Sequence, residues 1–372
     1  MARVARAFLA WYETVARDLP WRRTRDPYAL WISEIMLQQT QVKTVIPYWE
    51  RWMRALPTLA SLAAARESRV LKLWEGLGYY RRARHLHQAA RVIMKSHGGG
   101  FPKDPHIVLS LPGIGRYTAG AICSLAYNLP TPIVDGNVIR VLTRVFGIEG
   151  DPKENPARKR LWALAEALVL RASRQAPLNP ATTRRPAFLK TFGHCGNLNQ
   201  ALMELGATVC SPASPRCDAC PLRTFCFARH HERQDSLPHA GRRERSVARR
   251  HVAFVLCHGN HLLIRQRPEG GVNARLWEFP CDEPRKGRPL SQCAAAWEMR
   301  LGDLEKWMTV RHSITRYRIT LTAYRGEVLE RKAPALRHGR WVTRRQLSSI
   351  PFTGAHRKLV EALLQGSAET RI

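Results

Sequence analysis

The sequence predicts a mainly helical protein that carries a smaller α+β domain at its C-terminal end. Apolar residues recur at spacings of three and four along residues 1–228, which is the period of an α-helix. After residue 250 the pattern changes to short alternating runs separated by turn residues, as in β-strands. Residues 229–250 between these parts are polar, rich in Arg and His and without apolar periodicity, so they predict an interdomain linker.

The helical part is expected to contain a series of helices separated by Pro and Gly. The periodic segments are 29–53, 58–75, 81–95, 116–127, 136–147, 157–171 and 198–208. An ordinary helix is expected at the start of the chain, because Glu13 and Asp18 are unlike the residues of a signal peptide or presequence. Residues 172–194 are Pro-rich and basic, and they predict a loop insertion.

Residues 251–368 predict a separate α+β domain. The runs HVAFVL and HLLIRQ flank a Gly-Asn turn and predict a β-hairpin. The alternating run YRITLTAYRGEV predicts a strand, and GRWVTRRQL predicts a short strand that leads into a helix. The run HRKLVEALLQ predicts a closing helix.

The charge of the chain indicates a polyanionic partner. Lys and Arg total 60 against 29 Asp and Glu, which gives a formal net charge of +31. The apolar runs are far shorter than the roughly 18–20 residues that a bilayer span needs. Basic residues are spread along the chain rather than placed beside an apolar anchor. Nucleic acid is therefore favoured over a membrane surface.

Four of the nine cysteines lie within residues 210–226, as Cys210-x6-Cys217-x2-Cys220-x5-Cys226. An odd, uneven set argues against a secreted disulfide framework and favours a reducing, cytoplasmic setting. Four thiolates at this spacing can hold one iron–sulfur cluster. A zinc ion is the alternative, although zinc ribbons usually use two Cys-x-x-Cys pairs and this run has one.

Residues 101–127, FPKDPHIVLSLPGIGRYTAGAICSLAY, predict a helix–hairpin–helix. A short helix ends at Leu111, a turn contains Gly113 and Gly115, and a second helix begins near Arg116. The glycines allow the backbone to approach a partner closely, and the free amides at the second helix can bind phosphate. A plain helical turn could have the same sequence, but the strong positive charge favours DNA binding.

Two carboxyl groups of the helical part, those of Glu34 and Asp135, are candidate functional groups. Glu34 lies among Trp31, Ile32 and other apolar residues, and such surroundings raise the pKa of a carboxyl. Asp135 directly precedes a predicted helix. Each has a simpler alternative, since Glu34 could be a surface residue and Asp135 a helix cap.

The run WISEIMLQQTQV, the LPGIG turn and the cysteine spacing together resemble the MutY-type adenine DNA glycosylases of the helix–hairpin–helix superfamily. The resemblance covers nearly the whole chain. It implies two helical lobes with an active site between them, a 4Fe–4S cluster on the four cysteines and a MutT-like C-terminal domain. It also implies a monomer that acts on an adenine mispair in double-stranded DNA, in the cytoplasm at the nucleoid.

The resemblance further implies the roles of individual residues. Glu34 would be the general acid that protonates adenine N7, and Asp135 would stabilise the oxocarbenium sugar. Tyr117 and Asn137 would orient these groups. The adenine would be flipped out of the duplex into a pocket. The residues expected in that pocket are Leu19, Trp21, Arg22 and Gln200.

Further positions match residues of the family that contact DNA. Gln39 and Tyr79 match residues that wedge into the duplex. The family usually has Phe-Ser-His where this chain has Ile314, Thr315 and Arg316. Thr315 keeps a hydroxyl, and Arg316 could stack on a base or hold a phosphate. Discrimination of 8-oxoguanine from guanine is therefore the least defined part of the prediction.

The residue at position 117, a tyrosine, helps to distinguish an adenine glycosylase from an endonuclease III-type enzyme. Endonuclease III has a lysine at the corresponding position, whose amine forms a Schiff base and cuts the strand. A tyrosine cannot do so, and we expect a monofunctional glycosylase. An endonuclease III-type enzyme for oxidised pyrimidines and a non-catalytic DNA-binding iron–sulfur protein remain as alternatives. The C-terminal domain has only Asp282, Glu283 and Glu298 within residues 282–302, so no nucleotide hydrolysis is expected.

Overall fold

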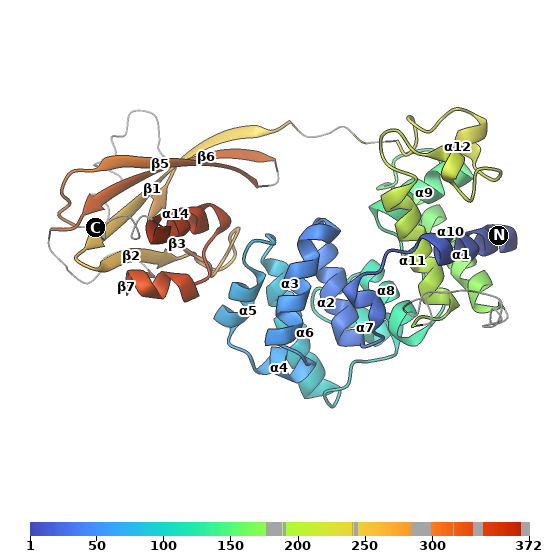
Figure 1. Ribbon diagram of the computed structural model, residues 1–372, viewed down its shortest axis with the longest axis horizontal. Coiled ribbons are helices and arrows are strands. Elements are labelled where there is room, and N and C mark those ends of the chain that lie inside the picture. Colours follow the sequence, from blue (N-terminus) through green and yellow to red (C-terminus); the bar gives the residue numbers. More distant parts are fainter. Residues whose placement is uncertain are drawn as a thin grey trace. The chain divides into compact units, whose positions relative to one another are not determined.

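The computed structural model describes residues 1–175, 188, 191–239, 241, 245–283, 299–314, 316–329 and 338–365. The chain forms two compact units, and their order along the sequence is interleaved (Figure 1). Unit 1 contains Met1–Ala64 and His85–Arg243, and unit 2 contains Ala65–Arg84 and Glu244–Ile372. No helix among the described residues is long and apolar enough to cross a membrane.

Unit 1 is built from helices, with one helix, α6, beginning at the end of the unit 2 segment. The helices are α1 (Ala2–Val15), η1 (Pro20–Arg23), α2 (Pro27–Leu37), α3 (Val42–Ala55), α4 (Leu59–Ala64), α6 (Arg81–Ser96), α7 (Pro105–Ser110), α8 (Arg116–Tyr127), α9 (Gly136–Phe146), α10 (Asn155–Ser173), α11 (His194–Thr208), η3 (Cys217–Ala219) and α12 (Phe227–His230).

Most of these helices lie where the apolar spacing predicts them. The segment 58–75 forms two helices, α4 and α5 (Glu67–Trp74), instead of one. The segment 29–53 likewise forms two helices, α2 and α3. The break lies at Gln39, whose φ of 58° is left-handed and cannot continue a right-handed helix. Apolar periodicity continues across the break, so the sequence pattern alone does not reveal it. The predicted insertion at 172–194 lies mostly outside the described residues.

The core of unit 1 is formed by the apolar faces of α1, α8, α9, α10 and α11. Close approach of α11 to α9 depends on Gly206. A Cβ atom at this position would lie 2.6 Å from the Cβ of Asn137, a distance that side chains do not adopt. The glycine therefore brings the first turn of α9, which begins after Asp135, against α11.

Unit 2 contains a seven-stranded sheet in which β1 and β6 pair in parallel and the other pairs of strands are antiparallel. The main order is β3-β2-β1-β6-β5, with β4 paired to β1 and β7 to β2. The elements are α5 (Glu67–Trp74), β1 (Val247–His258), β2 (His261–Gln266), β3 (Trp277–Glu278), β4 (Cys281–Asp282), β5 (Glu305–Ile314), β6 (Tyr317–Glu327), β7 (Gly339–Thr343), η4 (Arg344–Ser349) and α14 (Gly354–Gln365).

The structure therefore confirms the predicted fold class, a helical part followed by an α+β domain. The hairpin, the alternating strand and the closing helix are present as β1–β2, β6 and α14. Strand β1 begins at Val247, inside the segment expected to be linker, because residues from Val247 to Cys257 pair with β6. The sequence also did not indicate that Ala65–Arg84 belongs to unit 2.

Candidate active site and cysteine loop

Glu34 lies in the second half of α2 and is only 4% exposed. Asp26 caps this helix through the amides of Tyr28 and Ala29, and Pro27 occupies its first turn. The Tyr117 hydroxyl, from the first turn of α8, donates a hydrogen bond of 2.7 Å to Glu34 Oε2. Burial raises the pKa of Glu34 to about 7, against the opposing effect of this hydrogen bond. Glu34 can therefore carry a proton at neutral pH.

Asp135 is the N-cap of α9, as its sequence position suggested. Its Oδ1 accepts a hydrogen bond from the Val138 amide at 2.7 Å, and its Oδ2 accepts one from Asn137 Nδ2 at 3.2 Å. Burial raises the pKa of Asp135, and these hydrogen bonds act in the opposite direction by stabilising the anion. The charge of Asp135 in turn favours the protonated form of Glu34. The two carboxyl groups are thus electrostatically coupled.

Arg140 links this carboxylate to the cysteine loop, and the sequence analysis did not identify it. Its Nη2 donates to Asn137 Oδ1 and to the Gly206 carbonyl, both at 2.8 Å. Its Nε donates to the Cys210 carbonyl at 2.7 Å. The signal that could have found it is its spacing, because Asn137 and Arg140 are three residues apart and share one face of α9.

The four residues expected in the base pocket are buried. Arg22 is already engaged, since its Nη2 donates to Glu204 Oε2 at 2.8 Å. Gln200 Oε1 accepts a hydrogen bond from the Tyr12 hydroxyl at 3.0 Å. The Gln200 Nε2 atom is buried and has no hydrogen-bond partner among the described residues. Gln200 is therefore left with a donor for a further group.

The hairpin between α7 and α8 has the predicted form. Gly113 has a φ of 75°, and a Cβ atom there would lie 2.4 Å from the Cβ of His85. Gly115 is the N-cap of α8, is exposed and makes no side-chain cap, so the first amides of α8 are free of a side-chain acceptor. The Arg116 guanidinium lies 3.9 Å from the Trp162 ring centroid. This helix start is open to an anion.

The two residues expected to wedge into DNA have unusual backbone conformations. Gln39 has a φ of 58° and Tyr79 a φ of 45°, both in the left-handed region that residues other than glycine seldom adopt. Tyr79 is also 52% exposed. Strained and exposed residues of this kind are frequent at functional sites.

The four clustered cysteines line one pocket together with the α9 residues Val141, Arg144 and Val145. Arg144 Nη1 donates to Cys210 Sγ at 3.4 Å, and Gln234 Nε2 donates to Cys217 Sγ at 3.9 Å. Among the described residues, no group of three or more potential ligands is arranged to hold a single metal ion. The fold thus gathers the four cysteines around one pocket.

Comparisons with known proteins agree with this geometry. The family model for HhH-GPD superfamily base excision DNA repair proteins matches residues 32–167, and the NUDIX domain model matches residues 251–362. The chain is 35% identical to an adenine DNA glycosylase of Homo sapiens, over 95% of this chain and 72% of that protein. The chain belongs to the adenine DNA glycosylase family. It is accordingly an enzyme, a base-excision adenine DNA glycosylase.

Other relatives of this glycosylase show the same relationship. The adenine DNA glycosylase of Buchnera aphidicola from Acyrthosiphon pisum is 36% identical over 73% of this chain and 72% of that protein. Among solved structures, a thermostable thymine-DNA glycosylase is 30% identical, with a TM-score of 0.52, over 62% of this chain and 97% of that chain. The helical part of the fold is therefore shared with glycosylases that differ in the base named.

In the C-terminal domain of the glycosylase, the predicted recognition segment is only partly described. Ile314 ends β5 and Arg316 begins the turn to β6, whereas Thr315 lies outside the described residues. The guanidinium groups of Arg316 and Arg249 lie 5.4 Å and 4.3 Å from the Tyr317 ring centroid. Arg316 therefore belongs to a basic and aromatic group at this end of the sheet. Glu298, one of the three acidic residues weighed for hydrolysis, is also outside the described part.

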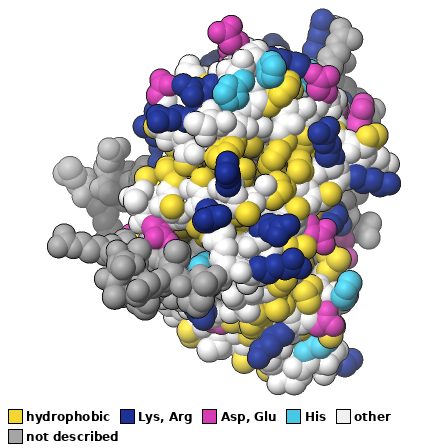
Figure 2. Space-filling view, turned by 90° about the vertical axis from the view of Figure 1, so that its right-hand side faces the viewer, with side chains coloured by type: hydrophobic (Ala, Val, Ile, Leu, Met, Phe, Trp, Pro, Cys, Tyr) yellow, Lys and Arg dark blue, Asp and Glu magenta, His cyan; other side chains and the backbone are white. Residues whose placement is uncertain are grey.

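The surface of the glycosylase reflects its charge. Figure 2 shows the face turned to the right in Figure 1, where α1 and α10 of unit 1 lie. Lys and Arg side chains are spread across an apolar band on this face, and acidic side chains lie mainly toward its edge. Such a distribution attracts nucleic acid over a range limited by salt.

Proposed function

We propose that this glycosylase hydrolyses the bond between adenine and deoxyribose where adenine is mispaired with 8-oxoguanine or guanine in double-stranded DNA. The observation that carries the mechanism is the contrast between Glu34 and Asp135. Glu34 is buried with a pKa near 7, whereas Asp135 is half-buried and accepts two hydrogen bonds. One carboxyl group is thereby suited to hold a proton and the other to remain an anion.

In the proposed reaction the flipped adenine enters the pocket, where Gln200 Nε2 supplies a free donor. Glu34 transfers its proton to adenine N7 as the C1′–N9 bond breaks, and the bonding electron pair leaves with the base. The Asp135 carboxylate stabilises the positive charge that develops on the sugar. Water then adds to C1′, and its proton returns to the Glu34 carboxylate. The residues supporting the two carboxyl groups are Tyr117 and Asn137.

Tyr117 also supports a monofunctional reaction. Strand cleavage by this fold requires an amine that attacks C1′, and the tyrosine hydroxyl cannot form a Schiff base. Its hydroxyl is directed to Glu34 instead. We infer that the product is an abasic site in an intact strand.

We further propose that the four cysteines hold a 4Fe–4S cluster. Glycosylases of this type usually carry one, and the gathering of the four cysteines around one pocket supports it. A zinc ribbon usually uses two Cys-x-x-Cys pairs, whereas residues 210–226 contain one such pair, which favours the cluster. Burial raises the pKa of the Cys220 thiol to about 11, so loading releases protons. When bound, the group would join the four cysteines of residues 210–226 to one another, next to the α9 residues that line the same pocket.

DNA contacts are assigned to the hairpin at Gly113, Gly115 and Arg116, to the wedge residues Gln39 and Tyr79, and to the recognition residues Thr315 and Arg316. The free amides of α8 support a phosphate contact. The enzyme would act as a monomer on nucleoid DNA in the cytoplasm.

The proposal is tested by single-turnover excision on duplexes with adenine opposite 8-oxoguanine, guanine or thymine, and with an oxidised pyrimidine. Adenine release opposite 8-oxoguanine and guanine is expected, with strand breaks only after alkaline treatment. Glu34→Gln should abolish excision and keep duplex binding, while Glu50→Gln, at an exposed position of α3, should behave as wild type. Release of the oxidised pyrimidine, or strand cleavage trapped covalently by borohydride, would contradict it.

The cofactor has its own measurement. Elemental analysis of the purified protein should give about four iron atoms per chain and visible absorbance from sulfide-bridged iron. Cys217→Ser should lose the iron, whereas Cys257→Ser, a half-buried cysteine in β1, should retain it. Stoichiometric zinc in place of iron would overturn the assignment.

A further inference from the structure

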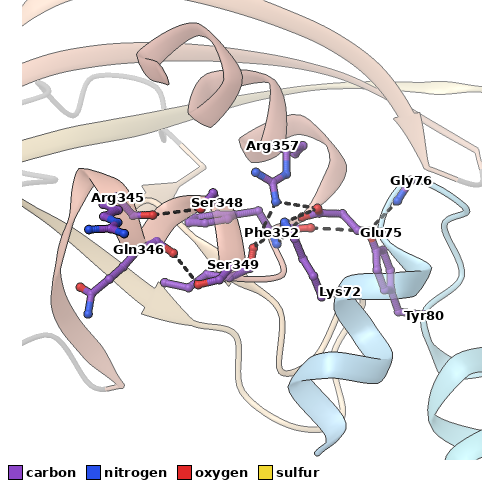
Figure 3. Close-up of polar contacts among 11 residues, drawn as sticks. Lys72, Glu75, Gly76, Tyr80, Arg345, Gln346, Ser348, Ser349, Phe352 and Arg357 are labelled. Atoms are coloured by element: carbon purple, nitrogen blue, oxygen red, sulfur yellow. Dashed lines mark hydrogen bonds and ion pairs between the residues drawn. The ribbon is translucent and has the colours of Figure 1, made fainter. Parts of the chain in front are cut away.

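Residues 65–84, which carry the exposed Tyr79, belong structurally to the C-terminal unit. The strap that holds them is the segment 350–357, which leads from η4 into α14 (Figure 3). On one side the strap pairs with β3, because the Trp277 amide donates to the Pro351 carbonyl at 2.9 Å and the Thr353 amide to the Trp277 carbonyl at 3.0 Å. The strap is thereby fixed to the sheet.

On its other side the strap contacts Glu75, the C-cap residue of α5. Glu75 Oε1 accepts a hydrogen bond of 2.8 Å from the Phe352 amide. Its Oε2 accepts bonds from Arg357 Nη2 at 2.6 Å and from Lys72 Nζ at 2.7 Å. The side chain of Glu75 is only 11% exposed and that of Arg357 15%. A partly buried carboxylate with three donors is strongly held, since charge-assisted hydrogen bonds are short and strong.

Two other side chains strengthen the same contact. The Tyr80 hydroxyl lies 3.5 Å from the Phe352 carbonyl and accepts a bond of 3.3 Å from the Gly76 amide. Lys72 Nζ also donates to the Ile350 carbonyl at 3.3 Å. Tyr80 is 4% exposed and Phe352 is fully buried, so this part of the contact is shielded from water. Figure 3 shows Lys72, Glu75 and Tyr80 on one side of this contact, and Phe352 and Arg357 of the strap on the other.

Between Glu75 and Tyr80 the chain makes a turn in which several residues have positive φ. The φ values of Gly76, Gly78 and Tyr79 are 104°, 70° and 45°. Trp74 Nε1 donates to the Gly78 carbonyl at 3.0 Å, and the Arg82 guanidinium lies 5.7 Å from the Tyr79 ring centroid. A left-handed tyrosine persists only when its surroundings determine the conformation. Both ends of this turn, at Glu75 and Tyr80, are fixed to the strap.

We propose that Glu75 is a positioning residue through which the strap of the C-terminal domain sets the turn that presents Tyr79 to DNA. The inference rests on the proposed contact of Tyr79 with the duplex. It gives the C-terminal domain a second part in mispair recognition, separate from any contact that Arg316 makes. The domain would hold the aromatic side chain that enters the duplex, as well as reading the opposite base.

The test is a double-mutant cycle on the full-length protein loaded with its cluster. Binding to a duplex with adenine opposite guanine is measured, with 2-aminopurine beside the adenine as a stacking probe. Glu75→Ala and Arg357→Met should each weaken mispair binding roughly fivefold to tenfold and reduce the fluorescence rise. Glu75→Gln, which keeps an acceptor for the Phe352 amide, should lose less. Lys358→Met removes a neighbouring exposed charge and should change neither signal.

Combination with Tyr79→Ala separates positioning from a general structural role. If Glu75 acts through Tyr79, Glu75→Ala should add no further loss of binding or fluorescence in the Tyr79→Ala background. The proposal would be overturned if the losses of the two single variants multiplied in the double variant. It would also be overturned if Tyr79→Ala alone left binding and fluorescence unchanged. Thermal unfolding of each variant shows whether its weaker binding comes from a destabilised fold. If Glu75→Ala proves unstable, Arg357→Met provides the second variant for the same comparison. Excision by the wild-type protein is assayed in parallel. Absence of adenine excision would contradict the proposed function, whereas a failed double-mutant cycle alone would contradict only the positioning role of Glu75.

Discussion

The Tyr117 hydroxyl is 2.7 Å from Glu34 Oε2 and 3.2 Å from the sulfur of Met203. The hydroxyl donates to the Glu34 carboxylate and thus favours its ionised form, while burial favours the protonated form more strongly. Burial, together with the charges of Glu34 and Asp135, raises the pKa of Tyr117 far above its ordinary value, so the hydroxyl keeps its proton. The residue at position 117 therefore influences the pKa of Glu34, the acid of the proposed reaction.

The first prediction concerns the pH dependence of excision. Because the acid must be protonated, the wild-type rate should fall as pH rises through about 7. Tyr117→Phe removes a hydrogen bond that lowers the pKa of Glu34, so the fall should move to higher pH. The measurement is the single-turnover rate between pH 5.5 and 9, roughly the range over which a perturbed carboxyl titrates. Tyr127→Phe, whose hydroxyl donates to the Phe101 carbonyl, is the control. A shift to lower pH would contradict the assignment of Glu34 as acid.

The second prediction concerns stability. The pKa of Glu34 in the folded protein, about 7, exceeds its ordinary value of 4.5. Its contribution to stability is therefore fully present below pH 4.5 and is lost as pH rises through 7. Glu34→Gln should remove this loss and raise the free energy of unfolding at pH 8 by up to about 3 kcal/mol. Denaturant unfolding at pH 5 and pH 8 checks it, with Glu50→Gln as control. An equal effect at both pH values would refute the linkage.

The third prediction concerns Arg140, which connects Asn137 to the Cys210 carbonyl. Arg140→Met leaves the Asn137 amide free to rotate, so the orientation of Asp135 is less defined. Excision at saturating enzyme should fall roughly tenfold or more, a loss of about 1.4 kcal/mol of transition-state stabilisation. Duplex affinity and iron content should be retained. Arg160→Met, an exposed change on α10, is the matched control. Full activity in Arg140→Met would show that the connection has no catalytic consequence.

The fourth prediction concerns Glu204, which is 1% exposed and pairs with Arg17 and Arg22. Burial alone would raise the pKa of Glu204, but the two arginines lower it below its ordinary value. Glu204→Ala leaves the buried Arg22 without its counter-charge, which should cost about 3–5 kcal/mol of folding free energy. Thermal unfolding at neutral pH checks this, and Glu166→Ala, at an exposed position of α10, should have little effect. A carboxyl group whose pKa is lowered by folding stabilises the folded protein at neutral pH, and this stabilisation is lost as the pH falls through the lowered pKa. The difference in stability between wild type and Glu204→Ala should therefore diminish in acid. A small loss at neutral pH would mean that Arg22 finds another partner.

Local patterns in the sequence predicted most of the helices, and the reason is physical. The helix expected at 116–127 is observed as α8 over the same residues, because its Gly-rich turn and apolar spacing are both local signals. The break at Gln39 was not predicted, since it depends on one left-handed residue within a continuous apolar pattern. The membership of residues 65–84 in unit 2 was also missed. Its main contact joins Glu75 to Arg357, which lie 282 positions apart in the sequence.

The residues of the candidate site also divide into those that the sequence predicted and those that it did not. The resemblance named Glu34, Asp135 and Tyr117, and the fold brings all three within electrostatic reach of one another. It did not name Arg140 or Glu204, whose importance comes from partners on other helices. The spacing of Arg140 from Asn137 is a local signal, but the contacts of Arg140 with Gly206 and Cys210 and that of Glu204 with Arg22 join distant parts of the chain and leave no local pattern.

The parallel pairing of β1 with β6 starts at Val247, where the Val247 amide donates to the Arg316 carbonyl at 2.8 Å. A fragment beginning at residue 251, where the NUDIX match starts, would omit four residues of a strand in the middle of the sheet order. The backbone of β6 from Tyr317 to Thr320 would lose its partner in β1 and become exposed to solvent and to other chains. Such a fragment should tend to aggregate, and a fragment that begins before Val247 should remain dispersed.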